Sequence, residues 1–385
     1  MLAKFCRILL MFILLFGSIN SRADTDPGVI VNKTIQSFMK ANRIPGVVVE
    51  LYVDGKPYSY NFGYANVATK KPVTDDTIFE IGSVSKLFTT LLLALEVNAG
   101  MMKFNDPVSK YLPDTGRLNI PFDRITLKDL ATHTSGLAFN APHNIKSEDA
   151  LMRYLVRWRP RAPVGSQWAY SNFGMGVLGI AIERRARQSY EQLDRDKILV
   201  PLHMSPHCIN VPLEAQQNLA QGYDGGGRPE LYSPVDILLG AWAIKASGLD
   251  MLHFLSAAIG FSDTPPMIIN AMRLTQSPSV VTKGMVQGLA WQVHRLDFFN
   301  KFSFLHSSRT MHIGPFPAFH LPANEQVFHA GNLIDKTGSM DGFRSYIAVI
   351  PEKRSGIVIL VNRGVSNGTM INVGRYILFK TSHII

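Results

Sequence analysis

Strand patterns near both ends of the chain, separated by a long stretch with few of them, constrain the fold more than any other feature. Residues 47–53 are rich in β-branched side chains, and Asp54-Gly55 predicts a tight turn before a returning strand at 58–64. Further strands are expected near the other end, at residues 289–293, 335–339, 343–350 and 356–362. Both ends of the chain can therefore contribute strands to one sheet.

Helical patterns fill the middle of the chain and flank the strands. Residues 26–41 carry apolar side chains at helical spacing, and residues 369–379 predict a closing helix. Residues 105–260 predict mostly helices, one of which Thr126 can cap. We therefore expect an α+β fold: an antiparallel sheet built from both chain ends and flanked by helices, with a mostly helical inserted domain.

This pattern predicts two intertwined domains. Residues 24–81 and 288–385 would form an α/β domain, and residues 82–287 a mostly helical one. Within the second, residues 222–234 (G-Y-D-G-G-G-R-P-E-L-Y-S-P) predict a long irregular loop. A loop of that length in a compact domain is often functional.

The first 23 residues have the composition of a secretory signal peptide. Lys4 and Arg7 precede an unbroken apolar run at residues 8–16, and Ser21-Arg22-Ala23 resembles a small-x-small cleavage site. A membrane anchor is the less favoured alternative, because the run is too short to span a bilayer stably. We expect an exported, periplasmic protein with no membrane contact after cleavage.

The distribution of charged residues, cysteines and histidines limits which ligands and cross-links the chain can have. Without residues 1–23 the chain has 36 basic against 29 acidic residues, but the basic ones are scattered rather than clustered, so no nucleic-acid binding is expected. Only Cys208 is then left, which excludes an internal disulfide. No His or Cys spacing matches a metal site, so we expect no metal and no cofactor, and by default a monomer.

The stretch F-E-I-G-S-V-S-K-L-F at residues 79–88 carries the first candidate chemistry. Ser83 and Lys86 are three residues apart at a helix start, so they share a face. Burial in this apolar stretch would lower the pKa of Lys86, and its neutral amine could then activate Ser83 as a nucleophile. The alternative is that Ser83 only caps the helix while Lys86 extends to solvent. S-x-x-K alone favours that alternative.

A second candidate motif is Tyr170-Ser171-Asn172, which precedes a helix rich in small residues. A tyrosine near two ammonium groups would have a lowered pKa and could act as a base. Asn172 could hold a lysine or a substrate carbonyl. Taken alone, an ordinary loop before a helix explains the motif better.

A third motif, Asp335-Lys336-Thr337-Gly338-Ser339, lies on a predicted strand. Lys336 could hold a substrate carboxylate, and Gly338 would let a ligand approach the strand edge closely. The backbone N–H groups of Ser339 and Ser83 could together form an oxyanion hole. The alternative is an ordinary polar strand end.

In this order and context, the three motifs resemble those of the serine β-lactamases and penicillin-binding proteins. Tyr170 follows Lys86 by 84 residues, and Lys336 follows Asn172 by 164. Y-x-N together with K-T-G is similar to class C β-lactamases in particular. Similar segments, including I-T-L-K-D-L-A-T-H-T-S-G-L and G-I-V-I-L-V-N-R, extend over nearly the whole chain after the signal sequence.

The resemblance implies a small-molecule β-lactam substrate and a role for each motif residue. Ser83 would be acylated, and Lys86 and Tyr170 would share the proton transfers. Lys336 would orient Tyr170 and the substrate's ring carboxylate, and Asn172 would hold the substrate's side-chain amide and Lys86. The other substrate-binding residues would be Asn140, where the family usually has a glutamine, Thr337, Gly338, Ser339, Asn367, and Tyr223 as the cleft wall in the Ω-like loop at 222–234.

Four residues depart from the family pattern. Asp335 replaces a neutral residue or histidine, although on a strand its side chain should point away from the face of Lys336. Asp341 and Arg344 replace glycines and add bulk and charge beside the strand. Met370 replaces a common arginine. These departures leave the preferred β-lactam open.

Three other functions are compatible with the same fold. A DD-peptidase would acylate with β-lactams but deacylate slowly. A family VIII-type esterase shares S-x-x-K and Y-x-N but usually lacks a clear K-T-G, which this chain has. A catalytically inactive penicillin-binding sensor is disfavoured because all three motifs are intact.

Overall fold

The computed structural model describes residues 26–112, 120–206, 208–232, 237–261, 263–296 and 313–385. The predicted signal peptide at 1–23 lies outside these residues. None of the helices in the described ranges has the length and apolarity needed to cross a bilayer.

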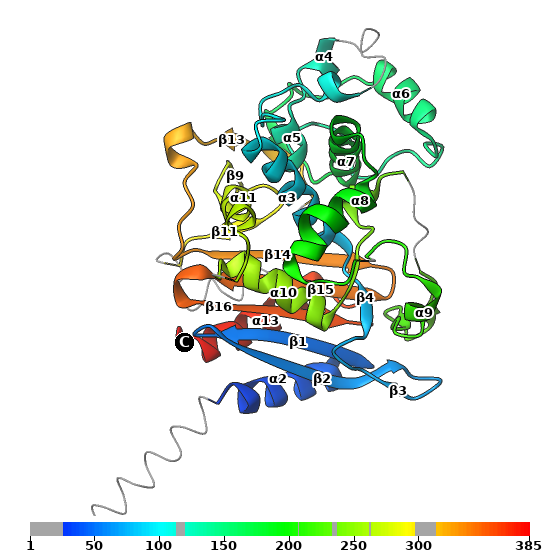
Figure 1. The fold of residues 1–385 in the computed structure, drawn as a ribbon, viewed down its shortest axis with the longest axis vertical. Coiled ribbons are helices and arrows are strands. Elements are labelled where there is room, and N and C mark those ends of the chain that lie inside the picture. Colours follow the sequence, from blue (N-terminus) through cyan, green and yellow to red (C-terminus); the bar gives the residue numbers. More distant parts are fainter. Residues whose placement is uncertain (1–25, 113–119, 207, 233–236, 262, 297–312) are drawn as a thin grey trace, which may run out of the picture.

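A ten-stranded antiparallel sheet forms the centre of the molecule, and it is built from both chain ends (Figure 1). The first strand, β1 (Gly46–Val53), pairs with β2 (Lys56–Asn66) in the expected hairpin and with β16 (Ser355–Val361) on its other side. The strand order is β13-β9-β10-β11-β14-β15-β16-β1-β2-β3. The remaining members are β3 (Lys71–Pro72), β9 (Val280–Thr282), β10 (Met285–Gln287), β11 (Gln292–His294), β13 (Phe319–His320), β14 (Leu333–Met340) and β15 (Phe343–Ile350).

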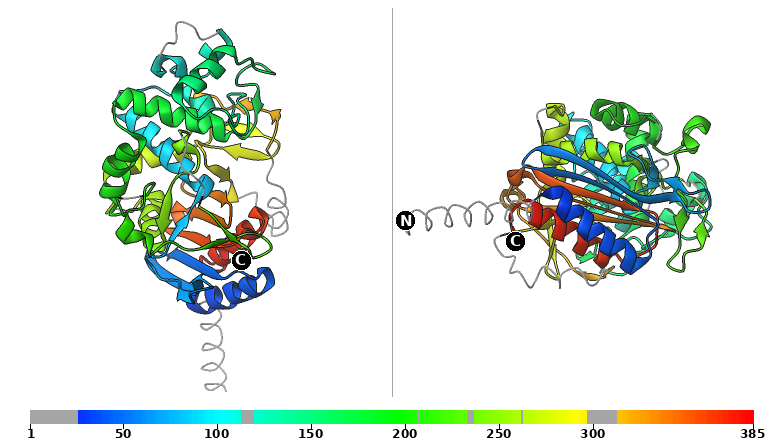
Figure 2. Two further views of the ribbon diagram at one scale, coloured as in Figure 1. Left: turned by 90° about the vertical axis from the view of Figure 1, so that its right-hand side faces the viewer. Right: turned by 90° about the horizontal axis from the view of Figure 1, so that it is seen from below.

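Helices cover both faces of the sheet. On one face α2 (Pro27–Asn42) and α13 (Asn367–Thr381) lie side by side, as the view from below shows (Figure 2). On the other face α10 (Gly248–Ile259) packs against β1 and β16. The other α-helices within the described residues are α3 (Ser85–Asn98), α4 (Ile120–Asp123), α5 (Leu127–Ala131), α6 (Glu148–Arg157), α7 (Asn172–Ala186), α8 (Tyr190–Asp194), α9 (Leu213–Gln216) and α11 (Pro266–Gln276).

The alternation of side chains along β1 divides the apolar interior into two cores. Val47, Val49 and Leu51 point into the core under α2 and α13, and Val48 points into the larger core that contains α3, α7 and α10. Both faces of this strand are therefore buried, which explains its continuous run of apolar residues.

Local sequence signals set several element boundaries. Thr126 caps α5 as predicted, accepting a hydrogen bond from the N–H of Asp129 while the Asp129 carboxylate accepts one from the N–H of Thr126. The strand expected at 289–293 is displaced, because the N–H of Gly288 bonds the carbonyl of Trp291 in a turn and β11 begins only at Gln292.

Several short parts of the predicted helical segment adopt strand structure. β9 and β10 lie within residues 82–287 and join the sheet beyond β11. The predicted irregular loop at 222–234 contains a short hairpin of β6 (Gly222–Tyr223) and β7 (Pro229–Glu230). Two further short pairs join β4 (Ile78–Glu80) to β8 (Lys245–Ser247) and β5 (Gln167–Trp168) to β12 (Phe316–Pro317).

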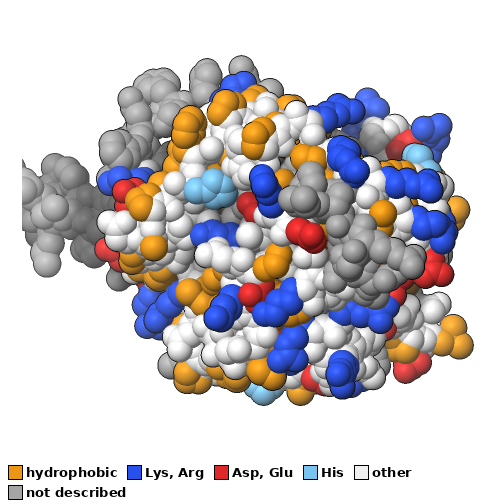
Figure 3. Space-filling view, turned by 90° about the horizontal axis from the view of Figure 1, so that it is seen from above, with side chains coloured by type: hydrophobic (Ala, Val, Ile, Leu, Met, Phe, Trp, Pro, Cys, Tyr) orange, Lys and Arg blue, Asp and Glu red, His pale blue; other side chains and the backbone are white. Residues whose placement is uncertain are grey.

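Basic side chains predominate over acidic ones on the face that carries α4 and α6 (Figure 3). They are dispersed over this face, as the scattered Lys and Arg residues of the sequence predict.

Candidate active site

Ser83 lies in a tight turn that presses against β14. Strand β4 leads into a 3₁₀ turn (Gly82–Val84), and α3 follows at once. Gly82 has a φ of 53°, and a Cβ there would lie 2.7 Å from the backbone nitrogen of Ser339, so a larger residue would push the turn off the strand. The N-cap of α3 is Val84 rather than Ser83, so Ser83 is not the helix cap.

Lys86 is fully buried in the first turn of α3 and donates from Nζ to Ser83 Oγ at 2.9 Å and to the Ala241 carbonyl at 2.7 Å. Burial lowers the pKa of Lys86 to about 8; Tyr170 opposes this shift and the charge of Lys336 adds to it. An amine with that pKa is partly neutral near pH 7. The alternative in which Lys86 extends to solvent is therefore wrong.

Tyr170 brings the second and third motifs together. Its hydroxyl accepts a hydrogen bond of 3.3 Å from Lys336 Nζ, and the Nζ atoms of Lys86 and Lys336 each lie 5.2 Å from the ring centroid. Burial alone would raise the pKa of Tyr170, but the charges of Lys336 and then Lys86 outweigh it and lower this pKa to about 7. A tyrosinate is thus available near neutral pH.

Gly338 allows β14 to contact the turn that carries Ser83. A Cβ at Gly338 would lie 2.0 Å from the Ile81 carbonyl oxygen, which also accepts a hydrogen bond of 2.7 Å from Ser345 Oγ. Because the two backbones meet here, Ser339 lies beside Gly82, and Gly82 directly precedes Ser83 in the chain. The two N–H groups suggested for an oxyanion hole therefore come from adjoining segments.

The two predicted asparagines on the other side of the site bond each other. Asn172, at the start of α7, donates from Nδ2 to Asn140 Oδ1 at 2.8 Å. Its own Oδ1 is buried without a hydrogen-bond partner among the described residues. The Nζ of Lys86 donates to Ser83 and to the carbonyl of Ala241. The described residues therefore do not contain the expected hydrogen bond between Asn172 and Lys86.

The end of β14 contacts the first residue of α13. Ser339 Oγ donates to Asn367 Oδ1 at 2.8 Å, and Lys336 Nζ donates to the carbonyl of Thr337 at 2.9 Å. Thr337 is half-buried on the strand between them. One border of the site is thus continuous, and it consists of Lys336, Thr337, Gly338, Ser339 and Asn367.

Tyr223 lies apart from this group. Its hydroxyl accepts from the N–H of Val67 at 2.9 Å, its own N–H bonds the carbonyls of Gly342 and Asn362, and its side chain is buried. None of its described contacts is with Ser83, Lys86 or Tyr170. Trp242 follows Ala241, whose carbonyl accepts a hydrogen bond from Lys86, and Trp242 is half-buried.

His133 is a site residue to which the sequence analysis gave no role. Its ring packs on the ring of Tyr170 with centroids 4.3 Å apart, and its Nδ1 accepts from the N–H of Ser171 at 3.3 Å. Burial, and then the charges of Lys86 and Lys336, hold the pKa of His133 well below its usual range. A neutral imidazole therefore supports Tyr170 from behind, although the sequence A-T-H-T-S-G contains no pattern for that role.

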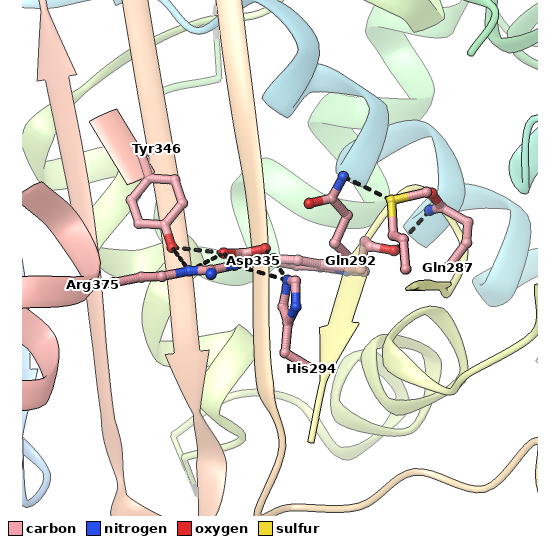
Figure 4. A network of polar contacts seen from close by, with 8 residues as sticks. Gln287, Gln292, His294, Asp335, Tyr346 and Arg375 are labelled. Atoms are coloured by element: carbon pink, nitrogen blue, oxygen red, sulfur yellow. Dashed lines mark hydrogen bonds and ion pairs between the residues drawn. The ribbon is translucent and has the colours of Figure 1, made fainter. Parts of the chain in front are cut away.

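Asp335 points away from Lys336, as predicted, into a buried polar network (Figure 4). Its Oδ2 accepts from Arg375 Nη2 at 2.6 Å and from the Tyr346 hydroxyl at 2.7 Å, and its Oδ1 lies 3.1 Å from His294 Nε2. Burial opposes ionisation, but Arg375 and His294 outweigh it and hold the pKa of Asp335 far below its usual range. The charge is thus neutralised behind the strand.

Helix α13 therefore contacts β14 at two points, Asn367 to Ser339 and Arg375 to Asp335. Eight helical residues span about 12 Å and four strand residues about 13 Å, so the two spacings match. Lys336 lies between these two contacts, on the opposite face of the strand.

The other departures have their described surroundings away from Ser83, Lys86 and Tyr170. Asp341 is exposed in the turn after β14. Arg344 donates to the carbonyls of Val365, Met340 and Phe343, which ties the β14–β15 turn to the start of α13. Met370 is fully buried in the core under α13. In the described ranges, no group of three or more His, Cys, Asp or Glu side chains could hold a metal ion.

Comparison with known proteins decides the family. The family model described as Beta-lactamase matches residues 31–381. The chain belongs to the beta-lactamase family. A beta-lactamase of Escherichia coli (strain K12) is 34% identical over 91% of this chain and 92% of its own length, and one of Pseudomonas fluorescens is 32% identical over 92% and 98%.

Solved structures place this beta-lactamase in class C. A class C beta-lactamase in complex with cefoxitin aligns with a TM-score of 0.86 and 31% identity over 92% of this chain and 99% of its own. A structure described as D-alanine carboxypeptidase AmpC from Burkholderia cenocepacia aligns with a TM-score of 0.85 and 31% identity over 92% and 98%. The expected fold and the class C, AmpC-type assignment are confirmed.

Proposed function

We propose that this enzyme hydrolyses the β-lactam amide of cephalosporins and penicillins through an acyl-enzyme on Ser83. The observation that carries the proposal is the 2.9 Å hydrogen bond from the buried Lys86 to Ser83, with Tyr170 held between Lys86 and Lys336. A partly neutral amine and an acidic phenol near one hydroxyl are the groups that make serine nucleophilic near pH 7.

In the acylation step, Ser83 Oγ attacks the lactam carbonyl carbon and its proton passes to the Lys86–Tyr170 pair. The N–H groups of Ser83 and Ser339 stabilise the resulting oxyanion. The C–N bond then breaks, and the ring nitrogen takes a proton from Tyr170. Lys336, with Asn367 and the Thr337–Ser339 edge, binds the ring carboxylate.

In the deacylation step, water replaces the ring nitrogen. Tyr170 takes a proton from the water, the hydroxide attacks the ester carbonyl, and Ser83 regains its proton as the acid product leaves. Asn140 and Asn172 present amide groups to the acyl side chain. The hydrogen bond between the two side chains, from Asn172 Nδ2 to Asn140 Oδ1 at 2.8 Å, holds these amides beside each other and supports a joint role.

A D-alanine peptidase activity is the second candidate, because a structural neighbour is described as a D-alanine carboxypeptidase. Steady-state hydrolysis of a chromogenic cephalosporin by residues 24–385 separates the two. We expect many product molecules per enzyme. A single stoichiometric burst, together with turnover of a peptide ending in D-Ala-D-Ala, would favour the peptidase. Turnover of simple esters alone would favour an esterase.

We further propose that the chain is exported to the periplasm after removal of residues 1–23 and acts there as a monomer. The division into an α/β domain at 24–81 and 288–385 and a mostly helical domain at 82–287 also stays a proposal. Its support is the sheet formed by both chain ends and the helices between them.

The lowered pKa of Tyr170 predicts an acidic limb in the pH profile. The active base is the deprotonated form, so kcat/KM should decline as the pH falls through about 7. Replacing Lys336 by Gln removes the largest lowering charge, so the midpoint of this limb should move to higher pH. Rates measured from pH 5 to 9 test this, and an unmoved midpoint in the variant would refute the assignment.

A further inference from the structure

A cavity of about 650 Å³ opens beside Tyr170, on the helical side of the molecule. We propose that it is a subsite for an anionic aromatic substituent on the ring that leaves Ser83 during acylation. The inference rests on the proposed function and deepens it. It concerns which β-lactams this chain prefers, which the departures from the family pattern left open.

Part of the cavity lining is aromatic and apolar. Phe139, Tyr154, Trp158, Tyr170 and Ile313 contribute to its lining, and the rings of Phe139 and Tyr170 lie 6.1 Å apart. A flat ring could stack on such surfaces and bury apolar area. The wall suits an aryl or heteroaryl group better than a small polar one.

Another part of the cavity lining is cationic. Arg157, Arg159 and Arg161 contribute to the lining, and no described lining residue is acidic. Arg159 donates to the carbonyls of Val156 and Trp158, which fixes it in the local chain. Neither Arg157 nor Arg161 has an ion pair or hydrogen bond within the described residues, and both are exposed. Two guanidinium groups are thus available for a carboxylate or sulfonate.

The position of Tyr170 assigns the cavity to the leaving ring. In the proposed mechanism Tyr170 protonates the ring nitrogen, so a cavity lined by Tyr170 borders the ring half of the substrate. The acyl side-chain amide is expected at the Asn140–Asn172 pair instead. An acidic group on the leaving ring should therefore reach Arg157 and Arg161, and one on the acyl side should not.

The test uses three cephalosporins: a parent with a neutral aryl substituent on the leaving ring, the same compound with a carboxylate on that aryl group, and one with the carboxylate on the acyl side chain instead. We compare the enzyme with an Arg157→Gln/Arg161→Gln variant. Each exposed charge pair changes an equilibrium constant by up to about fivefold, so the loss of two pairs should raise KM for the ring-side acid by up to about 25-fold. Its kcat and its rates on the neutral parent should be unchanged.

Arg153→Gln is the matched control, since Arg153 is exposed on the same helix α6 but does not line the cavity. It should leave all three substrates unaffected. The preference for the ring-side acid should also weaken when the salt concentration is raised from about 0.05 to about 0.5 M. This change shortens the Debye length, which is about 10 Å at 0.1 M, severalfold and so screens the charge of the arginines.

Equal effects of the double variant on the ring-side acid and the neutral parent would overturn the subsite. A selective loss on the acyl-side acid would overturn its placement. Failure of all three compounds to turn over would instead sink the proposed function, because the neutral parent depends on no arginine of this cavity.

Discussion

Replacement of Ser83 by Ala is expected to abolish hydrolysis of a chromogenic cephalosporin. The variant lacks the hydroxyl that accepts a hydrogen bond from Lys86, so no ester can form at this position. Removal of the nucleophile in a serine hydrolase lowers kcat by on the order of 10⁶-fold, and an effect of at least 10⁴-fold is expected here. Steady-state absorbance at high enzyme concentration measures the residual rate.

Ser85→Ala is the appropriate control for this change. Ser85 lies two residues further on, is buried, and accepts a hydrogen bond of 3.1 Å from the N–H of Ile244. Its loss should cost about 1 kcal/mol of stability and change kcat only a few-fold. A Ser83→Ala protein that folds normally and still turns over the cephalosporin at more than a few per cent of the normal rate would exclude Ser83 as the nucleophile.

Among the variants proposed here, replacement of Asp335 by Asn should produce the largest decrease in the free energy of unfolding. The substitution keeps the shape but leaves the buried guanidinium of Arg375 without its counter-charge. Breaking a buried ion pair from one side typically costs about 3–5 kcal/mol. Chemical denaturation should show that loss in the free energy of unfolding, and the pairing of Arg375 with β14 behind Lys336 should weaken.

A double variant, Asp335→Leu with Arg375→Met, separates a lost ion pair from lost packing. It removes both charges together, and replacing a buried pair by apolar residues is often neutral or better. We expect it to be more stable than Asp335→Asn. If Asp335→Asn unfolds at the same denaturant concentration as the unaltered protein, or if the double variant loses the sum of both single effects, the account of this network is wrong.

Much of the fold follows from local sequence signals. Asp54-Gly55 places the β1–β2 turn, where Val53 pairs with Lys56, and the strand expected at 343–350 has those bounds in β15. These elements depend on turn chemistry and alternation, which neighbouring residues encode. The strands β9 and β10 were missed because three-residue segments carry too little periodicity, and their pairing at the sheet edge comes from tertiary contacts.

The contacts among the candidate site residues were predictable for a related reason. Ser83 and Lys86 share a helical face, so their contact is encoded within one turn, and Tyr170 and Lys336 come from motifs whose order is itself a signal. Tyr223 shows the limit, because the direction of its hydroxyl is decided by Val67, 156 residues away. For Asp335, the alternation of side chains along the strand predicted which face of the sheet it occupies. It did not predict the ion pair with Arg375 on α13.

Intact-protein mass spectrometry during turnover tests the central claim most directly. The enzyme is mixed with a slowly hydrolysed cephalosporin, quenched in acid at short times, and digested to locate any adduct. The account predicts a transient mass increase that maps to the peptide containing Ser83 and disappears as the substrate is exhausted. Complete hydrolysis with no adduct on Ser83 at any time, or an adduct on another residue that forms and decays at the turnover rate, would contradict it.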